Sequence, residues 1–110
     1  MIKPASMKVY FVYITTANHD DASLIGRALV EENLAACANI IEPMTSIYRW
    51  EGRIQQDQET VLIAKTTEKK IDELTKRVKQ IHSYDCPCIS AIPVEAGNAD
   101  YLNWIAETTR

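Results

Sequence analysis

Two thiols separated by one proline, Cys86-Pro87-Cys88, are the residues in this chain best suited to chemistry. Side chains at positions i and i+2 of extended backbone point to the same side, so both sulfur atoms can face one ligand. Thiolates are soft ligands that suit Cu(I) or zinc, and the pair could form half of such a site. Free cysteine also packs as a small hydrophobic residue, and a disulfide between these two would be strained and labile. The sequence leaves metal binding, redox chemistry and simple packing open.

A third metal ligand would have to come from Cys37, from His82 or from another subunit. Cys37 lies at an expected junction between a helix and a strand, where a small buried residue is also natural. His82 closes an expected helix, and a histidine at a helix C-terminus interacts well with the helix dipole. Lys65 leaves an apolar strand, so we expect a partly buried ammonium group that holds either an anionic ligand or a carboxylate of an adjoining subunit.

The elements that must position these residues follow from hydrophobic periodicity and turn signals. A nearly continuous apolar run predicts a strand over 8–16 that is buried on both faces. Cap candidates at 18–21 begin an amphipathic helix that ends near 34–36. Two long strands, 37–50 and 53–66, flank a turn at Glu51-Gly52, and Pro43 predicts a bulge or an edge in the first.

Thr67 can cap a helix whose apolar residues are Ile71, Leu74, Val78 and Ile81. A strand over 88–95 and a helix over 99–107, capped by Asn98, complete the chain.

This order of elements, β-α-β-β-α-β with a C-terminal helix, predicts an α+β ferredoxin-like sandwich with an antiparallel sheet. We expect one domain over 7–110 after a disordered lead over 1–6. The two central strands are about 14 residues long, whereas strands usually have about 5–6 residues. So long a hairpin must project from the domain, and its bare edges favour pairing with another chain in a closed homo-oligomer.

Composition excludes several classes of function. The 12 basic and 15 acidic residues give a net charge of -3, which argues against nucleic acid as the main partner. No stretch has the roughly 20 apolar residues that span a bilayer, and the first residues lack the apolar core of a signal peptide. The odd count of 3 cysteines fits a reducing compartment, so we expect a cytoplasmic protein without a membrane partner. The sequence contains no GxGxxG, Walker A, HExxH or GxSxG motif, and we expect no catalytic residue and no enzyme activity.

Five ordered segments resemble the CutA family of divalent-cation tolerance proteins over residues 8–107. They are RALVEENLAACANII (27–41), SIYRWEG (46–52), KTT (65–67), HSYDCP (82–87) and PVEAGNADYLNW (93–104). The resemblance implies a ferredoxin-like fold assembled as a tight homotrimer through its long hairpins. It also implies a role in tolerance to copper and other divalent metals, and an architecture similar to that of the PII signalling proteins.

The resemblance marks the polar and aromatic positions within its motifs as a ligand pocket or intersubunit contact: Tyr48, Trp50, Lys65, His82, Tyr84 and Asp85. Tyr48 and Trp50 suit either trimer packing or ligand stacking. Cys37 matches a position proposed among the family's copper ligands, whereas Cys88 replaces a residue that is commonly acidic. We therefore expect a non-catalytic trimer that binds copper or another divalent cation, with no obligatory cofactor. The alternatives are a PII-like module that binds a small anionic ligand between subunits, and a scaffolding trimer.

Overall fold

The computed structural model describes residues 8–110, so the predicted lead over 1–6 lies outside the described residues. Its elements are the strands β1 (Val9–Thr16), β2 (Cys37–Trp50), β3 (Arg53–Thr67) and β4 (Ile89–Pro93), the helices α1 (His19–Glu31), α2 (Ile71–Ile81) and α3 (Ala99–Thr108), and the 3-10 turn η2 (Glu68–Lys70). The strands form one antiparallel sheet in the order β2-β3-β1-β4. This topology confirms the predicted ferredoxin-like fold.

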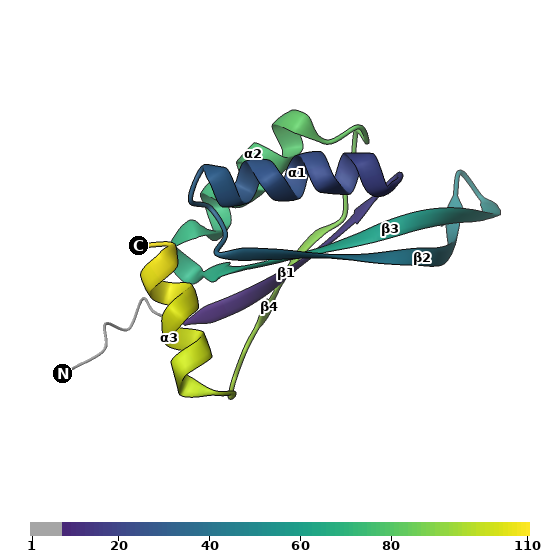
Figure 1. The fold of residues 1–110 in the computed structure, drawn as a ribbon. Helices are drawn as coiled ribbons and strands as arrows, with labels where there is room; N and C mark the ends of the chain where they lie inside the picture. Colours follow the sequence, from purple (N-terminus) through teal and green to yellow (C-terminus); the bar gives the residue numbers. More distant parts are fainter. Residues whose placement is uncertain (1–7) are drawn as a thin grey trace.

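Helices α1 and α2 lie together on one face of the sheet (Figure 1). The core lies between them and this face, and its fully buried members include Val12 and Ile14 of β1, Leu62 of β3, and Leu74 and Val78 of α2. These α2 residues belong to the apolar series that the sequence predicted. Burial of one helical stripe against alternate strand residues therefore accounts for the layered fold.

The opposite face of the sheet is covered only in part. Val9 and Phe11 of β1 pack there with Ile105 and Leu102 of α3, whereas Tyr13 and Thr15 further along the strand are half-buried. The expectation that β1 is buried on both faces is therefore wrong for the single chain. The reason is that α3 is short and reaches only the N-terminal half of the strand.

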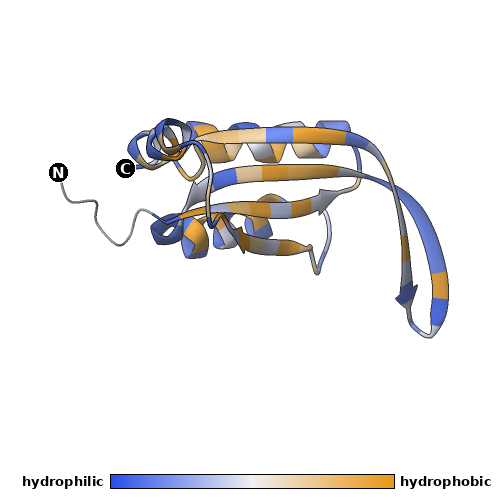
Figure 2. Ribbon diagram, turned by 90° about the horizontal axis from the view of Figure 1, so that it is seen from below, coloured by the Kyte–Doolittle hydropathy of each residue, from blue (hydrophilic) through white to orange (hydrophobic). Residues whose placement is uncertain are grey.

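The β2–β3 hairpin extends well past the body of the domain (Figures 1 and 2). The β1–β3 pairing ends at Thr16 and Thr60, so residues 53–59 of β3 pair with β2 alone. The register shifts between Ile41 and Met44, around the predicted irregularity at Pro43. Glu51 and Gly52 have φ values of 50° and 78°, which confirms the predicted tight turn. The result is a two-stranded ribbon that is solvent-exposed on both sides.

The ends of several elements differ from prediction. Asn18 caps α1 as expected, because its side chain accepts from the Asp21 amide at 2.8 Å. However, α1 ends earlier, at Glu31, and Asn33 then adopts a left-handed φ of 62°. Thr67 makes no side-chain capping bond, and η2 intervenes before α2 begins. β4 starts one residue after Cys88 and is shorter than predicted.

Candidate functional site

The Cys86-Pro87-Cys88 segment lies in the loop between α2 and β4. Both cysteines are free thiols and both are exposed to solvent. Cys88 Sγ lies 3.9 Å from Ser90 Oγ, at the limit of a weak sulfur hydrogen bond. The packing interpretation of this pair is therefore weakened, because an exposed thiol fills no space in a core. Two accessible thiols on one short loop can bind a soft metal ion.

Cys37 lies far from this pair. It is half-buried at the start of β2, where its Cα pairs with that of Lys65 and its sulfur lies 3.9 Å from Asn39 Nδ2. Since β2 and β4 are the opposite edges of the sheet, at least three strand spacings, or roughly 14 Å, separate Cys37 from Cys88. The fold therefore does not bring the three cysteines around one ion in a single chain. Within residues 8–110, no group of three or more His, Cys, Asp or Glu side chains is arranged to hold a metal ion.

His82 uses both ring nitrogens in hydrogen bonds. Its Nδ1 accepts from the backbone N–H of Tyr84 at 3.0 Å, so the ring proton lies on Nε2, which donates to the carbonyl oxygen of Thr15 at 2.8 Å. A metal ion binds the lone pair of an unprotonated ring nitrogen. In His82 that lone pair is on Nδ1, and it already accepts the hydrogen bond from Tyr84. In this arrangement His82 holds the loop after α2 onto the end of β1, and it offers nothing to a metal ion.

Tyr84 links this loop to the hairpin. Its hydroxyl donates to Glu59 Oε2 at 2.7 Å, and Ser46 Oγ donates to Oε1 of the same carboxylate at 2.6 Å. Partial burial of the phenol, followed by its hydrogen bond to Glu59, raises the pKa of Tyr84 well above the ordinary tyrosine value. Tyr84 is therefore held as a neutral donor, and the Glu59 carboxylate already accepts from two hydroxyl groups.

Tyr48 lies beside this cluster, whereas Trp50 and Asp85 lie apart from it. The Tyr48 hydroxyl donates to Asp57, and that bond raises the pKa of Tyr48. Trp50 is 59% exposed at the end of β2, next to the turn. Asp85 is exposed in the loop before the cysteine pair. The structure thus brings His82 and Tyr84 together, with ring centroids 4.8 Å apart and Tyr48 nearby, and leaves Trp50 and Asp85 elsewhere on the surface.

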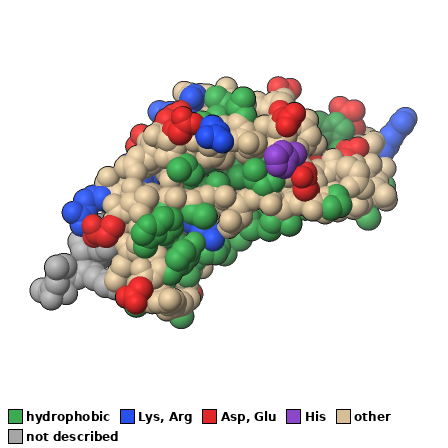
Figure 3. Space-filling model, in the orientation of Figure 1, with side chains coloured by type: hydrophobic (Ala, Val, Ile, Leu, Met, Phe, Trp, Pro, Cys, Tyr) green, Lys and Arg blue, Asp and Glu red, His purple; other side chains and the backbone are tan. Residues whose placement is uncertain are grey.

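Lys65 lies on the sheet face away from α1 and α2, under the aromatic residues of α3. Its Nζ donates to the hydroxyl oxygen of Tyr101 at 2.9 Å and lies 5.1 Å from the ring centroid of Phe11. Figure 3 shows that hydrophobic side chains gather along this side of the molecule. Lys65 is therefore a partly buried residue as predicted, and its recorded contacts within residues 8–110 are with neutral groups.

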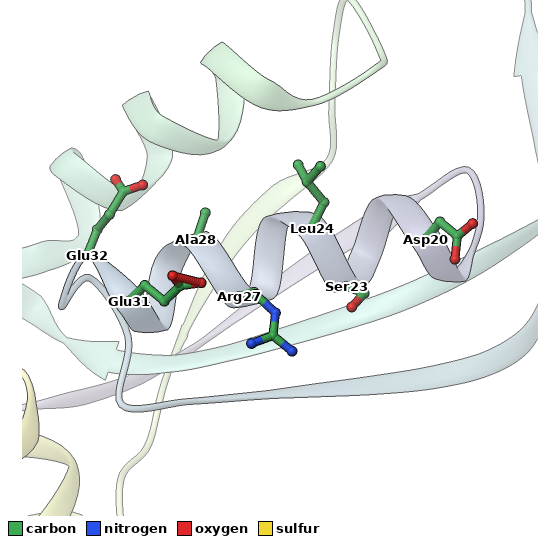
Figure 4. Close-up of a pocket in the computed structure, with 7 residues that line it drawn as sticks. All are labelled: Asp20, Ser23, Leu24, Arg27, Ala28, Glu31 and Glu32. Atoms are coloured by element: carbon green, nitrogen blue, oxygen red, sulfur yellow. The ribbon is translucent and has the colours of Figure 1, made fainter.

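Sequence reasoning missed the partners of these side chains. Asp57 and Glu59 alternate along β3 on one face of the ribbon, and this period-2 spacing was the signal that could have found them. Tyr101 lies in the helix that the sequence predicted over 99–107, but nothing in its spacing indicated a contact with Lys65. No motif predicted the open depression along α1 in Figure 4, whose lining combines Leu24 and Ala28 with charged residues such as Arg27 and Glu31. It contains none of the predicted site residues.

No helix in the described part of the chain is long and apolar enough to cross a membrane. Chemically, the molecule offers an accessible thiol pair, a carboxylate satisfied by two hydroxyls, and a cation surrounded by aromatic rings. These three features are separate within one chain, which argues that any larger site needs more than one copy.

Comparison with known proteins places this geometry in a family. The family model described as CutA1 divalent ion tolerance protein matches residues 10–108. The divalent-cation tolerance protein CutA of Thermus thermophilus is 48% identical over 98 residues, which cover 89% of this chain and 95% of that protein. The chloroplastic protein CutA 1 of Oryza sativa is 42% identical, and the match covers 90% of this chain but 56% of that relative.

A solved structure agrees with the sequence matches. The structure described as the periplasmic divalent cation tolerance protein CutA from Archaeoglobus fulgidus superposes with a TM-score of 0.89. It is 43% identical in sequence, and the match covers 93% of this chain and 99% of that one. The family model, the relatives and the fold all agree, and the chain therefore belongs to the CutA family of divalent-cation tolerance proteins.

Proposed function

We propose that this chain is a homotrimeric divalent-cation tolerance protein that binds copper or another divalent cation without catalysing a reaction. The observation that carries the proposal is the match of the family model over residues 10–108. The long ribbon and its exposed apolar residues, Ile47, Tyr48, Trp50 and Ile54, support assembly with other copies. The relatives named above are all CutA proteins, so the comparisons give the PII-like alternative no support.

The thiols of Cys86 and Cys88 are the metal-binding groups that the structure supports best within one chain. They are exposed, free and separated by one residue, whereas His82 has both nitrogens engaged in hydrogen bonds. Cys37 can join them only from another copy, because it lies at the opposite edge of its own sheet. The cytoplasmic location stays a prediction, since relatives are named as chloroplastic or periplasmic.

The test is metal binding by the full chain, purified without chelators or an affinity tag that holds nickel. We expect Cu(I) under anaerobic conditions, and Zn²⁺, to bind with a heat detectable by calorimetry. The double variant Cys86→Ser, Cys88→Ser should weaken binding by at least about tenfold, since both soft ligands are lost. Cys37→Ser is the matched control for losing a thiol elsewhere. Equal affinity in the double variant would remove the thiol pair as the site, and absence of binding by the unaltered chain would refute the cation-binding proposal itself.

Assembly is tested separately by light scattering. We expect a particle of three times the chain mass at working concentration. A stable single chain would contradict the trimer but would leave the thiol chemistry of each chain unchanged. The two parts of the proposal therefore fail independently.

A further inference from the structure

We infer that Lys65 and Tyr101 form a binding site for a carboxylate group on the sheet face beside α3. This site lies apart from the cysteine pair and does not depend on the proposed cation role. The observation behind it is a half-buried lysine whose ammonium group has only uncharged contacts among the described residues.

The charge of Lys65 has no counter-ion in the described part of its own chain. Within residues 8–110, no carboxylate lies within 4.0 Å of its Nζ; the four ion pairs present involve other residues. The segment over 1–7, MIKPASM, contains no aspartate or glutamate that could supply one. A cation that is in contact with apolar rings and also has access to solvent can accept an anionic partner, and hydrogen bonds to charged acceptors are the strong ones. An anion from outside the chain would supply the missing partner.

The two polar groups are arranged to bind one carboxylate together. Lys65 Nζ donates to the hydroxyl oxygen of Tyr101 at 2.9 Å, which leaves two ammonium protons and the phenol proton without acceptors in the described chain. Two donors this close can each reach one oxygen of the same carboxylate, and hydrogen bonds to an ionised acceptor are the strong ones. The site therefore favours a carboxylate over a neutral amide of the same shape.

Aromatic rings line the rest of the site. The ammonium group lies 5.1 Å from the centroid of Phe11, which attracts it by a cation–π interaction, and 5.3 Å from the centroid of Tyr101, whose hydroxyl oxygen accepts its hydrogen bond. Trp104 stacks on Tyr101 with centroids 5.7 Å apart, and it remains 46% exposed. An apolar or aromatic group attached to the carboxylate can therefore pack on the tryptophan. The ligand class that fits is a small carboxylic acid with an apolar body, or an acidic side chain of a second copy of the chain.

The experiment compares benzoate with benzamide, which has the same shape without the charge. We expect benzoate to raise the melting temperature of the full chain in a dose-dependent way, and benzamide to leave it unchanged. Lys65→Met should weaken benzoate binding by about tenfold or more, Tyr101→Phe by a smaller factor, and Lys65→Arg should retain it. Lys79→Met, on the exposed side of α2, is the matched control and should bind benzoate normally.

A second measurement, the dissociation of the assembly in light scattering, distinguishes the two possible sources of the carboxylate. If a second copy supplies the carboxylate, benzoate should not shift the melting temperature. Lys65→Met should then make the assembly dissociate at a higher protein concentration in light scattering. Lys65→Arg and Lys79→Met should leave that concentration unchanged. If the ligand is a free acid, benzoate binds and Lys65→Met leaves the assembly intact. The inference is overturned if Lys65→Met matches Lys79→Met in both measurements. Metal binding by the cysteine pair is measured independently, so failure here does not affect that proposal.

Discussion

Replacing His82 by alanine should destabilise the fold without affecting metal binding. His82 is the C-cap residue of α2, and its ring connects this helix end to the following loop and to β1. The ring accepts from the Tyr84 amide at 3.0 Å and donates to the Thr15 carbonyl at 2.8 Å. It also contacts the Tyr84 ring, with centroids 4.8 Å apart. Tyr84 in turn bonds Glu59 on the ribbon. The histidine is therefore a structural link between the helix layer, the sheet and the base of the hairpin.

The size of the effect follows from these contacts. Each hydrogen bond contributes about 1 kcal/mol net, and an aromatic contact contributes about 0.5–1.5 kcal/mol. His82→Ala should therefore lower the free energy of unfolding by about 2.5–3.5 kcal/mol. In His82→Asn, the amide oxygen can accept from the N–H two residues ahead, as asparagine does in turns, so about 1 kcal/mol of this loss should be recovered.

The assay is urea unfolding followed by circular dichroism at one fixed protein concentration, because an assembly links stability to concentration. His19→Ala is the matched control, since His19 is exposed and its nearest charged neighbour, Asp20, is 3.9 Å away. This variant should change the free energy by less than about 0.5 kcal/mol. Equal stability of the His82→Ala and His19→Ala variants would refute the linking role. A loss of metal affinity in His82→Ala with unchanged stability would show that the imidazole binds metal.

Two further predictions concern the hairpin and its base. Because Tyr84 has a raised pKa in the folded state, its neutral form contributes stability that is present below the ordinary tyrosine pKa of about 10 and is lost as the pH rises beyond it. The stability difference between the unaltered chain and Tyr84→Phe should therefore shrink above pH 10 in urea unfolding at several pH values; a constant difference would contradict this. Gly52→Ala should destabilise by about 1 kcal/mol, because φ is 78° there although the space beside it is open. Gly97→Ala, which has ordinary contact distances, is its control, and equal melting temperatures would count against the argument.

The fold was predictable because its signals are local. Proline at 43, glycine at 52 and the apolar period of α2 each determine a structure within a few residues of themselves. The end of α1 at Glu31 was missed because apolar residues continue to Ala36, although these residues belong to the connection that follows the left-handed Asn33. The partial exposure of β1 was missed because a pattern of apolar residues does not distinguish a face covered by its own helix from one left open.

The site was less predictable because its contacts join distant parts of the chain. Lys65 and Tyr101 are separated by 36 positions, and Tyr84 and Glu59 by 25. Single residues such as Lys65 and Tyr84 could be named from their types and motifs, but their partners depend on which edges and loops the topology brings together. For the cysteines, the fold sets a limit that spacing in the sequence does not show, since Cys37 and Cys88 lie at opposite edges of one sheet.

The hairpin has a consequence for the lifetime of the chain in the cell. Beyond the last β1–β3 pair, residues 53–59 are held only by β2, and an isolated two-stranded ribbon is marginally stable in water. A newly made chain without neighbours would therefore present its most easily opened segment at the tip farthest from the core. Proteases that remove unassembled subunits would find an extended substrate there, and docking of further copies would withdraw it. In the proposed assembly, the length of the ribbon would thus tie the survival of each chain to its docking with other copies.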